Sequence, residues 1–412
     1  MKKEIVYMAS AALALVSCGE PAKQASELTV IPMEAAFAEQ AGLNMSECFK
    51  KVRYVPLETT DSSLVGKYTS VQVLNQYIVV TSEDKYCHLF DKQTGRFIRS
   101  IGHVGNDPQG YSTVSGGWCN PHTDELAFPG WNHSWVMYGT DGKYRRHWKA
   151  PIAATGFPAI ALYNYAGADE VVGYYPASDS LPLRIALFKG DETVRVDTLF
   201  KERLGELPLT PADIASISVM KAGALIITDK SGKTHVYSMS NDCFWRHDGN
   251  LYLKMVFNDT IYSVSPTDGV QPARVLSLGK HAWPYEERYE EHKEGIYPES
   301  ILEGDDVMLI NFAVGFYGTM GDMKNSYIAC YRKSDGSVKI TSAEKQIVDD
   351  LNGFLPVRPQ SVSESGEFAA YLPAYEVAEW FADNADRKDL PADIEALRKV
   401  GEEDNPVVVL ME

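Results

Sequence analysis

A short unit, in which a strand runs through a Gly-containing turn into another strand, recurs along most of this sequence. The clearest copy spans residues 68–101, where short apolar segments lead to the turn Lys92-Gln93-Thr94-Gly95 and the alternating segment 96–101 follows it. Glycine tolerates the positive φ that such hairpin turns require. Alternation of polar and apolar residues is typical of a half-buried strand. The unit therefore predicts an antiparallel β-sheet.

Fainter copies of this unit follow along the chain, at residues 135–148, 184–199, 260–269 and 327–341. A spacing of roughly 40–50 residues with four strands per unit is the sequence pattern of a β-propeller. Residues 52–373 have room for about six blades. The 31 Gly, 21 Pro and 23 Tyr residues favour many short strands joined by tight turns. We therefore predict an all-β fold, a six-bladed β-propeller.

A propeller has to close its ring, because an open terminal blade exposes unpaired strand edges. Residues 52–57 form a candidate closing strand, which would complete the last blade beside residues 367–371. Helical periodicity over 375–400, interrupted at Pro391, predicts two short helices near the C-terminus. Residues 406–411 predict a final strand. The propeller domain is thereby assigned to residues 51–412.

The N-terminus has the features of a secretory signal. Lys2 and Lys3 precede an apolar segment of about a dozen residues, which is too short to span a bilayer well. Leu15-Val16-Ser17-Cys18 follows and resembles the bacterial lipobox, which is cleaved before a cysteine that becomes lipidated. Residues 1–17 are therefore predicted to be a signal peptide, Cys18 a lipidation site that holds the protein to a membrane, and residues 18–50 a tether with a short helix around 33–41. The alternative is an ordinary signal peptide with a chance cysteine near its end.

The net charge and the cysteine content limit the classes of ligand and metal site that this chain is expected to have. The net charge of −17 argues against a nucleic-acid partner, because phosphate affinity depends on basic surface. If Cys18 is lipidated, five of the six cysteines remain, and no CxxC motif occurs. Most of the five are expected to be small buried residues, although a single disulfide remains open in an oxidising compartment. A zinc site is not expected, because Cys and His do not cluster at ligand spacing.

Several stretches in the expected order resemble the six-bladed β-propeller lipoproteins of Gram-negative gut-type bacteria, whose fold is related to NHL-type propellers. The matching stretches are residues 54–59, 89–102, 257–262, 350–353 and 404–409. One departure is the loop 105–111, where the family pattern G-x-G-P-x-E-Y has lost its second Gly and its Glu. The resemblance implies a propeller with a lipid anchor in the outer membrane, facing the periplasm or the exterior. It implies no settled activity, because most of the family has no known function.

The sequence is richest in aromatic and His residues between 118 and 148. The residues predicted to bind a ligand there are Trp118, His122, Trp131, His133 and Trp135. Aromatic faces with polar tips, gathered in a concave site, suit sugars or peptides. The alternative is that these Trp side chains pack between blades. We expect a binding protein of the cell envelope for a glycan, a peptide or a partner protein, without a resident cofactor or an assigned catalytic residue.

The rival hypothesis is an enzyme. NHL-like propellers include lyases and hydrolases, often with a metal in the axial channel held by His residues from several blades. An unknown divalent metal would here be held by residues such as His103, His122, His133 and His235. A subunit of an envelope complex is a third possibility, which a large exposed apolar patch would favour.

Overall fold

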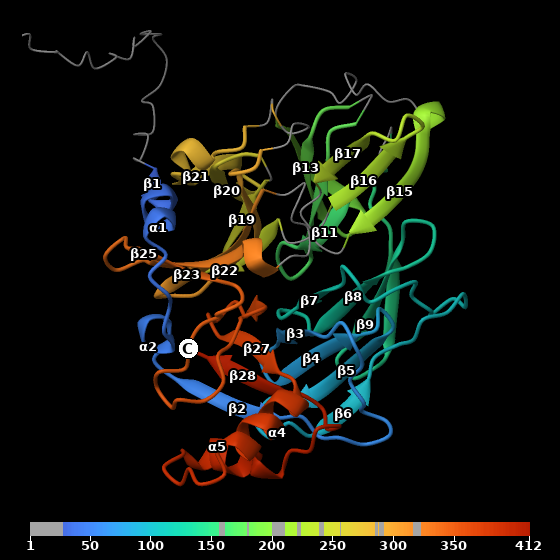
Figure 1. Cartoon of the computed structure of the whole chain (residues 1–412). Helices are drawn as coiled ribbons and strands as arrows, with labels where there is room; N and C mark the ends of the chain where they lie inside the picture. The colour runs from blue at the N-terminus through green and yellow to red at the C-terminus, as the bar shows by residue number, and fades with distance from the viewer. Residues whose placement is uncertain are drawn as a thin grey trace, which may run out of the picture.

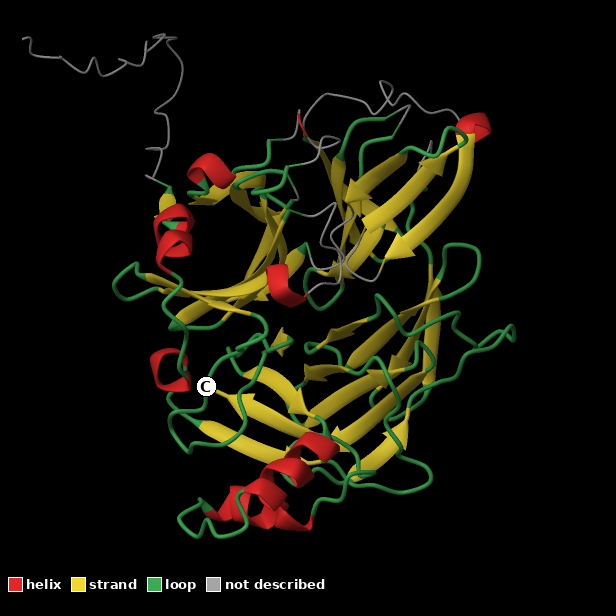
Figure 2. Cartoon of the chain, viewed as in Figure 1, coloured by secondary structure: helices red, strands yellow, loops and turns green. Residues whose placement is uncertain are grey.

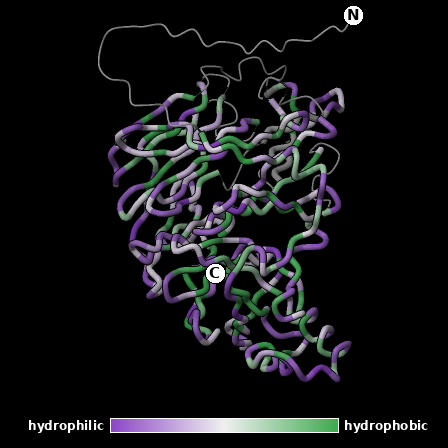
Figure 3. Tube along the Cα trace, turned by 90° about the vertical axis from the view of Figure 1, so that its left-hand side faces the viewer, coloured by the Kyte–Doolittle hydropathy of each residue, from purple (hydrophilic) through white to green (hydrophobic). Residues whose placement is uncertain are grey.

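The strands of this chain form sheets that are arranged around a common axis (Figure 1). The computed structural model describes residues 28–155, 161–178, 181–199, 211–220, 224–238, 243–255, 257–284, 287, 292–315 and 323–412. In these ranges the strands make seven sheets, six of which are the blades of a propeller. Hydrophobic and hydrophilic residues are interspersed along the trace (Figure 3).

Blades 1 to 3 are four-stranded antiparallel sheets that follow one another along the chain. Blade 1 contains β3 (Ser70–Val73), β4 (Tyr77–Ser82), β5 (Tyr86–Asp91) and β6 (Phe97–Ser100). Blade 2 contains β7 (Trp118–Asn120), β8 (Glu125–Pro129), β9 (Trp135–Gly139) and β10 (Tyr144–Trp148). Blade 3 contains β11 (Leu162–Tyr165), β12 (Glu170–Tyr175), β13 (Arg184–Lys189) and β14 (Glu192–Thr198).

Blades 4 and 6 each recruit a strand from the N-terminal part of the chain. Blade 4 contains β18 (Phe244–His247), β19 (Asn250–Lys254), β20 (Thr260–Ser265) and β21 (Gly269–Leu276), with β1 (Thr29–Ile31) as its fifth strand. Blade 5 contains β22 (Ile296–Glu303), β23 (Val307–Val314), β24 (Ser326–Arg332) and β25 (Val338–Ser342). Blade 6 contains β26 (Ser361–Val362), β27 (Phe368–Leu372), β28 (Val407–Met411) and β2 (Val52–Pro56).

The antiparallel order gives the ring two different faces. The first strand of each blade lies at the axis. Turns between the first and second strands, and between the third and fourth, lie on what we call the hairpin face. Turns between the second and third strands, and the connections from one blade to the next, lie on the opposite side, the connection face.

Hydrophobic cores between neighbouring blades show that the ring is closed. In the described part of the chain there are six such cores, one for each pair of neighbours. The pair formed by the last and the first blade has its own core, where Val408 and Val71 are both buried. A solenoid or an open stack of sheets would lack this core, so the predicted six-bladed propeller is confirmed.

The seventh sheet is an insertion that the sequence analysis did not predict. It contains β15 (Ile214–Met220), β16 (Ala224–Asp229) and β17 (Thr234–Ser238) and lies between β14 and β18 in the sequence. Blades 3 and 4 nevertheless share a core, in which Leu187 and Leu253 are buried together. The inserted sheet therefore does not interrupt the ring and lies outside it, at the upper right of Figure 1.

The ring is closed by β2, as predicted for residues 52–57, but its neighbour differs from the expected one. β2 pairs with β28, in a register that joins Val52 to Met411 and Pro56 to Val407. The expected partner, β27, pairs with the other edge of β28. The physical reason is that β28 is apolar and buried along its whole length, so it occupies a position inside the sheet.

Residues 28–51 form what we call the N-terminal strap, which runs down the left side of Figure 1 across blades 4, 5 and 6. β1 pairs in parallel with β21, and α1 (Met33–Glu39) and α2 (Met45–Cys48) follow. Ile31 and Met33 are fully buried. This part of the predicted tether 18–50 is therefore packed on the ring, so the folded body starts ahead of residue 51. The short helix expected around 33–41 is observed as α1.

The remaining helices lie at the periphery (Figure 2). The predicted pair near the C-terminus is observed as α4 (Ala374–Asp383) and α5 (Ala392–Glu395), which continues into a 3-10 turn at Ala396–Lys399. Val377 and Leu397 bury these helices against the core between blades 5 and 6. Among the helices in the described ranges, none has the length and apolar character needed to cross a membrane.

Candidate functional site

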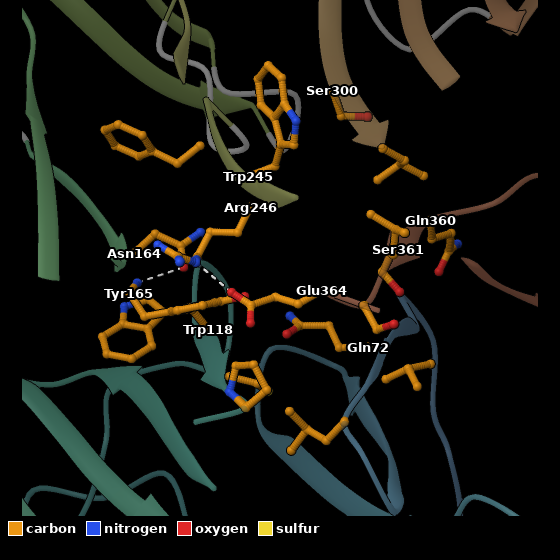
Figure 4. A pocket seen from close by; sticks show the side chains of 18 of the residues that line it. Gln72, Trp118, Asn164, Tyr165, Trp245, Arg246, Ser300, Gln360, Ser361 and Glu364 are labelled. Carbon is orange, nitrogen blue, oxygen red and sulfur yellow. Dashed lines mark hydrogen bonds and ion pairs between the residues drawn. The ribbon is translucent and has the colours of Figure 1, made fainter. Parts of the chain in front are cut away.

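A cavity of about 210 Å³ lies on the axis of the ring, where the first strands of all six blades meet (Figure 4). It is lined by residues of β3, β7, β11, β18, β22 and β26. Because each blade contributes at the same point of its repeat, the fold itself assembles this site. An axial cavity is also where propellers bring side chains from distant parts of the sequence together.

Most polar side chains in the axial cavity are uncharged. They come from four strands or their ends: Gln72, Asn164, Ser300, Gln360 and Ser361. Part of their hydrogen-bonding capacity is already used, since the amide of Asn311 donates to Ser300 Oγ (3.0 Å) and the backbone N–H of Tyr165 donates to Asn164 Oδ1 (2.8 Å).

Two buried polar atoms at this cavity have no hydrogen-bond partner within the described part of the chain. They are the indole Nε1 of Trp118 and the hydroxyl Oγ of Ser361. A buried polar atom without a partner costs about 1–3 kcal/mol, and most such atoms in proteins bind a water molecule or a ligand. Trp118 and Ser361 both line the cavity, so unused hydrogen-bonding capacity lies in its wall.

Aromatic rings form the apolar part of the lining. Trp118 packs beside Tyr165, with ring centroids 6.3 Å apart, and Phe244 and Trp245 lie on β18. The Trp245 indole is held in place, because its Nε1 donates to Glu303 Oε2 (2.8 Å) and its ring stacks on Tyr252 with centroids 5.6 Å apart. The Trp245 ring is therefore a fixed surface of the lining.

A charged cluster braces the cavity near the hairpin face. Glu364, in the turn between β26 and β27, accepts a hydrogen bond from Arg246 Nε (2.5 Å) and pairs with His122 Nε2 (3.0 Å). Arg246 also donates to the backbone carbonyls of Gly249 (2.9 Å) and Ala166. The cluster thus joins blades 2, 3, 4 and 6. Burial, and then the negative charge of Glu364, raises the pKa of Tyr165 well above its ordinary value, so Tyr165 stays protonated as a donor.

The predicted ligand-binding residues divide between two places. Trp118 lines the axial cavity, and His122 binds Glu364 at its rim. Trp131, His133 and Trp135 instead line a second cavity of about 720 Å³ on the connection face, between blades 2 and 3. Trp118 and Trp135 are neighbours, with ring centroids 6.1 Å apart, so this pair separates the two cavities.

Most of the Trp side chains between residues 118 and 148 pack between blades, which was the alternative interpretation of this segment. Trp118, Trp135 and Trp148 are buried in the core between blades 2 and 3. Trp131 is 49% exposed, and its Nε1 donates to the carbonyl of Gly105 (2.7 Å). Among the four Trp residues of this segment, Trp131 is therefore the exposed one.

The four His residues considered for a metal are not brought together. His103 lies in the loop after β6 and pairs with Asp107 (2.6 Å), while His122 lies in the turn after β7. His133 lies between β8 and β9, and His235 is on β17 in the inserted sheet. In the described ranges no three His, Cys, Asp or Glu side chains are grouped as a metal ion would require. Cys18 lies outside the described residues.

Sequence reasoning missed most of the axial residues, because no motif marks them. Gln72, Asn164, Ser300 and Ser361 are polar residues in short strands that carry no recognisable motif. The signal that was present is positional, since each belongs to the first strand of its blade or lies next to it.

One solved structure shares the fold of this chain. A crystal structure of a Bacteroides fragilis protein assigned as exported is similar to this chain with a TM-score of 0.56 and 15% identity, covering 93% of this chain and 99% of that chain. A member of the DUF4221 family from Bacteroides vulgatus has a TM-score of 0.44 and 11% identity, covering 90% and 98%. The Cps50 β-propeller domain from Myceliophteria thermophila has a TM-score of 0.40 and 9% identity, covering 88% and 100%.

None of the curated proteins matches this sequence. The resemblance to six-bladed propellers of unknown function is confirmed, while the NHL relationship and the lipid anchor remain predictions. The model of one family, described as "Domain of unknown function (DUF4934)", matches residues 28–412, which include the strap, all six blades and the final strand. The chain therefore belongs to the DUF4934 family.

Proposed function

We propose that this protein is an exported, lipid-anchored binding protein of the cell envelope, and that its axial cavity binds one uncharged sugar unit of a glycan. The observation that carries the proposal is the lining of the axial cavity. Uncharged polar side chains converge there with aromatic rings, and Trp118 Nε1 and Ser361 Oγ lack hydrogen-bond partners in the described part of the chain.

The chemistry of the lining favours a sugar over other small ligands. Sugar hydroxyls both donate and accept, as Gln72, Asn164 and Ser361 do, while the apolar face of a sugar ring packs on aromatic rings such as Trp118. An ionic ligand would need an unpaired charge, but the charged lining residues Arg246 and Glu364 already pair with each other. The volume of about 210 Å³ lies below the ~300 Å³ at which drug-sized sites begin, so the occupant is a single small unit.

A peptide or a partner protein is the second candidate, and the cavity on the connection face favours it. This cavity is larger, at about 720 Å³, and is bordered by the exposed ring of Trp131. Exposed Trp side chains are common anchors in protein interfaces. This candidate predicts that Trp131→Ala abolishes binding, whereas the sugar proposal predicts that Trp131→Ala has no effect.

Binding measurements on the full chain carrying Cys18→Ala test the sugar proposal. A glycan array identifies the ligand, and titration calorimetry with the free sugar gives its affinity. Trp118→Phe removes the free N–H and keeps a ring, so we expect affinity to fall about tenfold or more. The matched control is Trp148→Phe, since Trp148 is buried in the same core but donates to Gly190 outside the cavity. Binding that is equally strong in Trp118→Phe and in the control would refute the axial site.

The lipid anchor is tested separately through Cys18. We expect the wild-type protein in the membrane fraction and the Cys18→Ala variant in the soluble fraction, because acyl chains on Cys18 would be the attachment. A variant that stays in the membrane fraction would contradict the anchor. Nine residues separate Cys18 from Leu28, the first described residue, so the propeller would stay within about 35 Å of the bilayer surface.

A further inference from the structure

Two cysteines that are far apart in the sequence meet where the N-terminal strap crosses blade 5. Cys48 is the last residue of α2, and Cys330 lies in the middle of β24. Their sulfur atoms are 3.2 Å apart. Both side chains are buried, with 7% of Cys48 and 4% of Cys330 exposed, in the core between blades 5 and 6.

The backbone around Cys330 is fixed by its sheet. β24 is flanked on both sides, so Cys330 pairs with Leu309 of β23 and with Lys339 of β25. Its side chain points to the same face as Ile328, toward blade 6. Cys330 therefore has little freedom to turn away from the strap.

The backbone around Cys48 is fixed by contacts that do not involve sulfur. Glu47 forms an ion pair with Lys339, and its carbonyl accepts from Arg332 (3.3 Å). Ser46 donates through its backbone N–H (2.9 Å) and its hydroxyl (2.5 Å) to the carboxylate of Asp350. Because both partners are positioned independently, the approach of the two sulfur atoms is a property of the fold.

We propose that Cys48 and Cys330 form a disulfide bond that fastens the N-terminal strap to blade 5. The inference rests on the export proposed above, because disulfides form in oxidising compartments outside the cytosol. The two thiols lose two protons and two electrons as the S–S bond forms. The oxidant is a second disulfide, that of an envelope thiol oxidoreductase, which is reduced to two thiols by exchange.

The bond forms while the chain folds. Contact with Cys330, and then burial, raises the pKa of the Cys48 thiol far above its ordinary value. The thiolate is the reactive species, so the folded, reduced protein would exchange slowly. Cys48 and Cys330 are open to an oxidant before the strap docks on the ring.

Refolding in vitro tests the proposal with the full chain carrying Cys18→Ala. The denatured, reduced protein is refolded in a glutathione redox buffer, its remaining thiols are alkylated, and the digest is mapped by mass spectrometry. We expect a linked peptide that contains Cys48 and Cys330, lighter than the two separate peptides by two hydrogen atoms. Folded protein in which both cysteines become alkylated after denaturation would overturn the proposal, as would pairing of either one with a different cysteine.

A stability measurement provides a second readout. Reduction of the refolded protein should lower its melting temperature by about 2–5 °C. Cys87→Ala is the matched control, because Cys87 is buried in a different core and this variant should keep the full response to reductant. A wild-type melting temperature that does not respond to reductant would contradict the bond. The experiment is independent of export, since a protein that refolds with this disulfide but stays in the cytosol of its host would refute export alone.

Discussion

Glu303 joins blades 4 and 5 and offers a sharp test of how the ring is held together. It is the last residue of β22 and is fully buried. Its carboxylate accepts from Trp245 Nε1 and Arg274 NH1, each at 2.8 Å, and pairs with Lys333 Nζ at 2.7 Å. Arg274 in turn lies over the ring of Tyr252, 4.6 Å from its centroid. One carboxylate thus balances two cations at a joint between blades.

Glu303→Gln keeps the size of the side chain and removes its charge. Arg274 and Lys333 would then face a neutral amide, and breaking a buried pair in this way costs about 3–5 kcal/mol. The family match spans residues 28–412, and a domain of about 385 residues has an entropy of unfolding of about 0.8 kcal/mol per degree. We therefore expect the melting temperature to fall by about 4–6 °C.

The pH dependence gives the same experiment a second readout. Burial alone would raise the pKa of Glu303, but the hydrogen bond and charge of Arg274, with help from Lys333 and Trp245, outweigh it and lower the pKa below 4.5. A carboxyl group whose pKa is lower in the folded state stabilises the protein above its unfolded pKa. The gap between wild type and Glu303→Gln should therefore be full at neutral pH and shrink as the pH falls below 4.5.

Differential scanning calorimetry at neutral and acidic pH provides the measurement. The matched control is Glu412→Gln, because the ion pair between Glu412 and Lys51 is exposed, with 55% and 79% of the two side chains accessible. Such surface pairs contribute about 0–1 kcal/mol, so the control should melt within about 1 °C of wild type. If Glu303→Gln melts no lower than the control, or if its gap to wild type does not change with pH, the role assigned to Glu303 is wrong.

Three further variants test other parts of the ring. Gly95 and Gly336 both have φ near +70°. A Cβ on Gly95 would lie 2.0 Å from the carbonyl oxygen of Pro56 in the closing strand, whereas a Cβ on Gly336 would meet nothing within 4 Å. The Gly95→Ala variant should therefore have a lower melting temperature than Gly336→Ala. Burial lowers the pKa of Lys254 from 10.5 to about 8, so between these two pH values the unfolded chain binds more protons than the folded one. The free energy of unfolding should therefore rise with pH across this window. Denaturant titrations should find this rise in the wild type and not in Lys254→Met. Ile31→Ala should lower the melting temperature by about 2–6 °C, because the fully buried Ile31 fastens β1 to blade 4.

The blades could be predicted from sequence because their signal is local. Each copy of the repeat carries its own alternating strands and its own Gly turn, as at Gly95 and Gly336, both of which adopt the expected positive φ. The closing strand was also predictable, since a closed ring requires a strand that pairs with the open edge of the last blade. Its place beside β28 was not, because that depends on which strand is buried on both faces, and Val407–Met411 reveals this only as an unbroken apolar run.

The strap and the inserted sheet were missed for a different reason. β1 is three residues long, two of them exposed, and its stability comes from parallel pairing with β21, more than 200 residues away in the sequence. No local pattern records such a partner. The inserted sheet has the same strand-turn-strand character as a blade, and only the shared core of blades 3 and 4 shows that it lies outside the ring.

The axial site was partly predictable. Trp118 and His122 were found through the density of aromatic and His residues, whereas Gln72, Asn164, Ser300 and Ser361 carry no such signal. Their meeting is a consequence of the sixfold arrangement, so it becomes visible only when the repeats are placed in space. A different cavity contains Trp131, His133 and Trp135, although they are close to Trp118 in sequence. The reason is that they lie at the connection-face end of their blade, whereas Trp118 lies on its axial strand.

The pairing of β2 with β28 also sets the order in which the ring can close. A ribosome makes β2 more than 300 residues before its neighbour β28. Until β28 has been made, the edge of β2 that will pair with it is therefore unpaired and exposed to other nascent chains. A chain that stops before residue 407 lacks β28, so β2 has no strand to pair with. Closure of the ring through β2 therefore cannot precede the synthesis of residues 407–411.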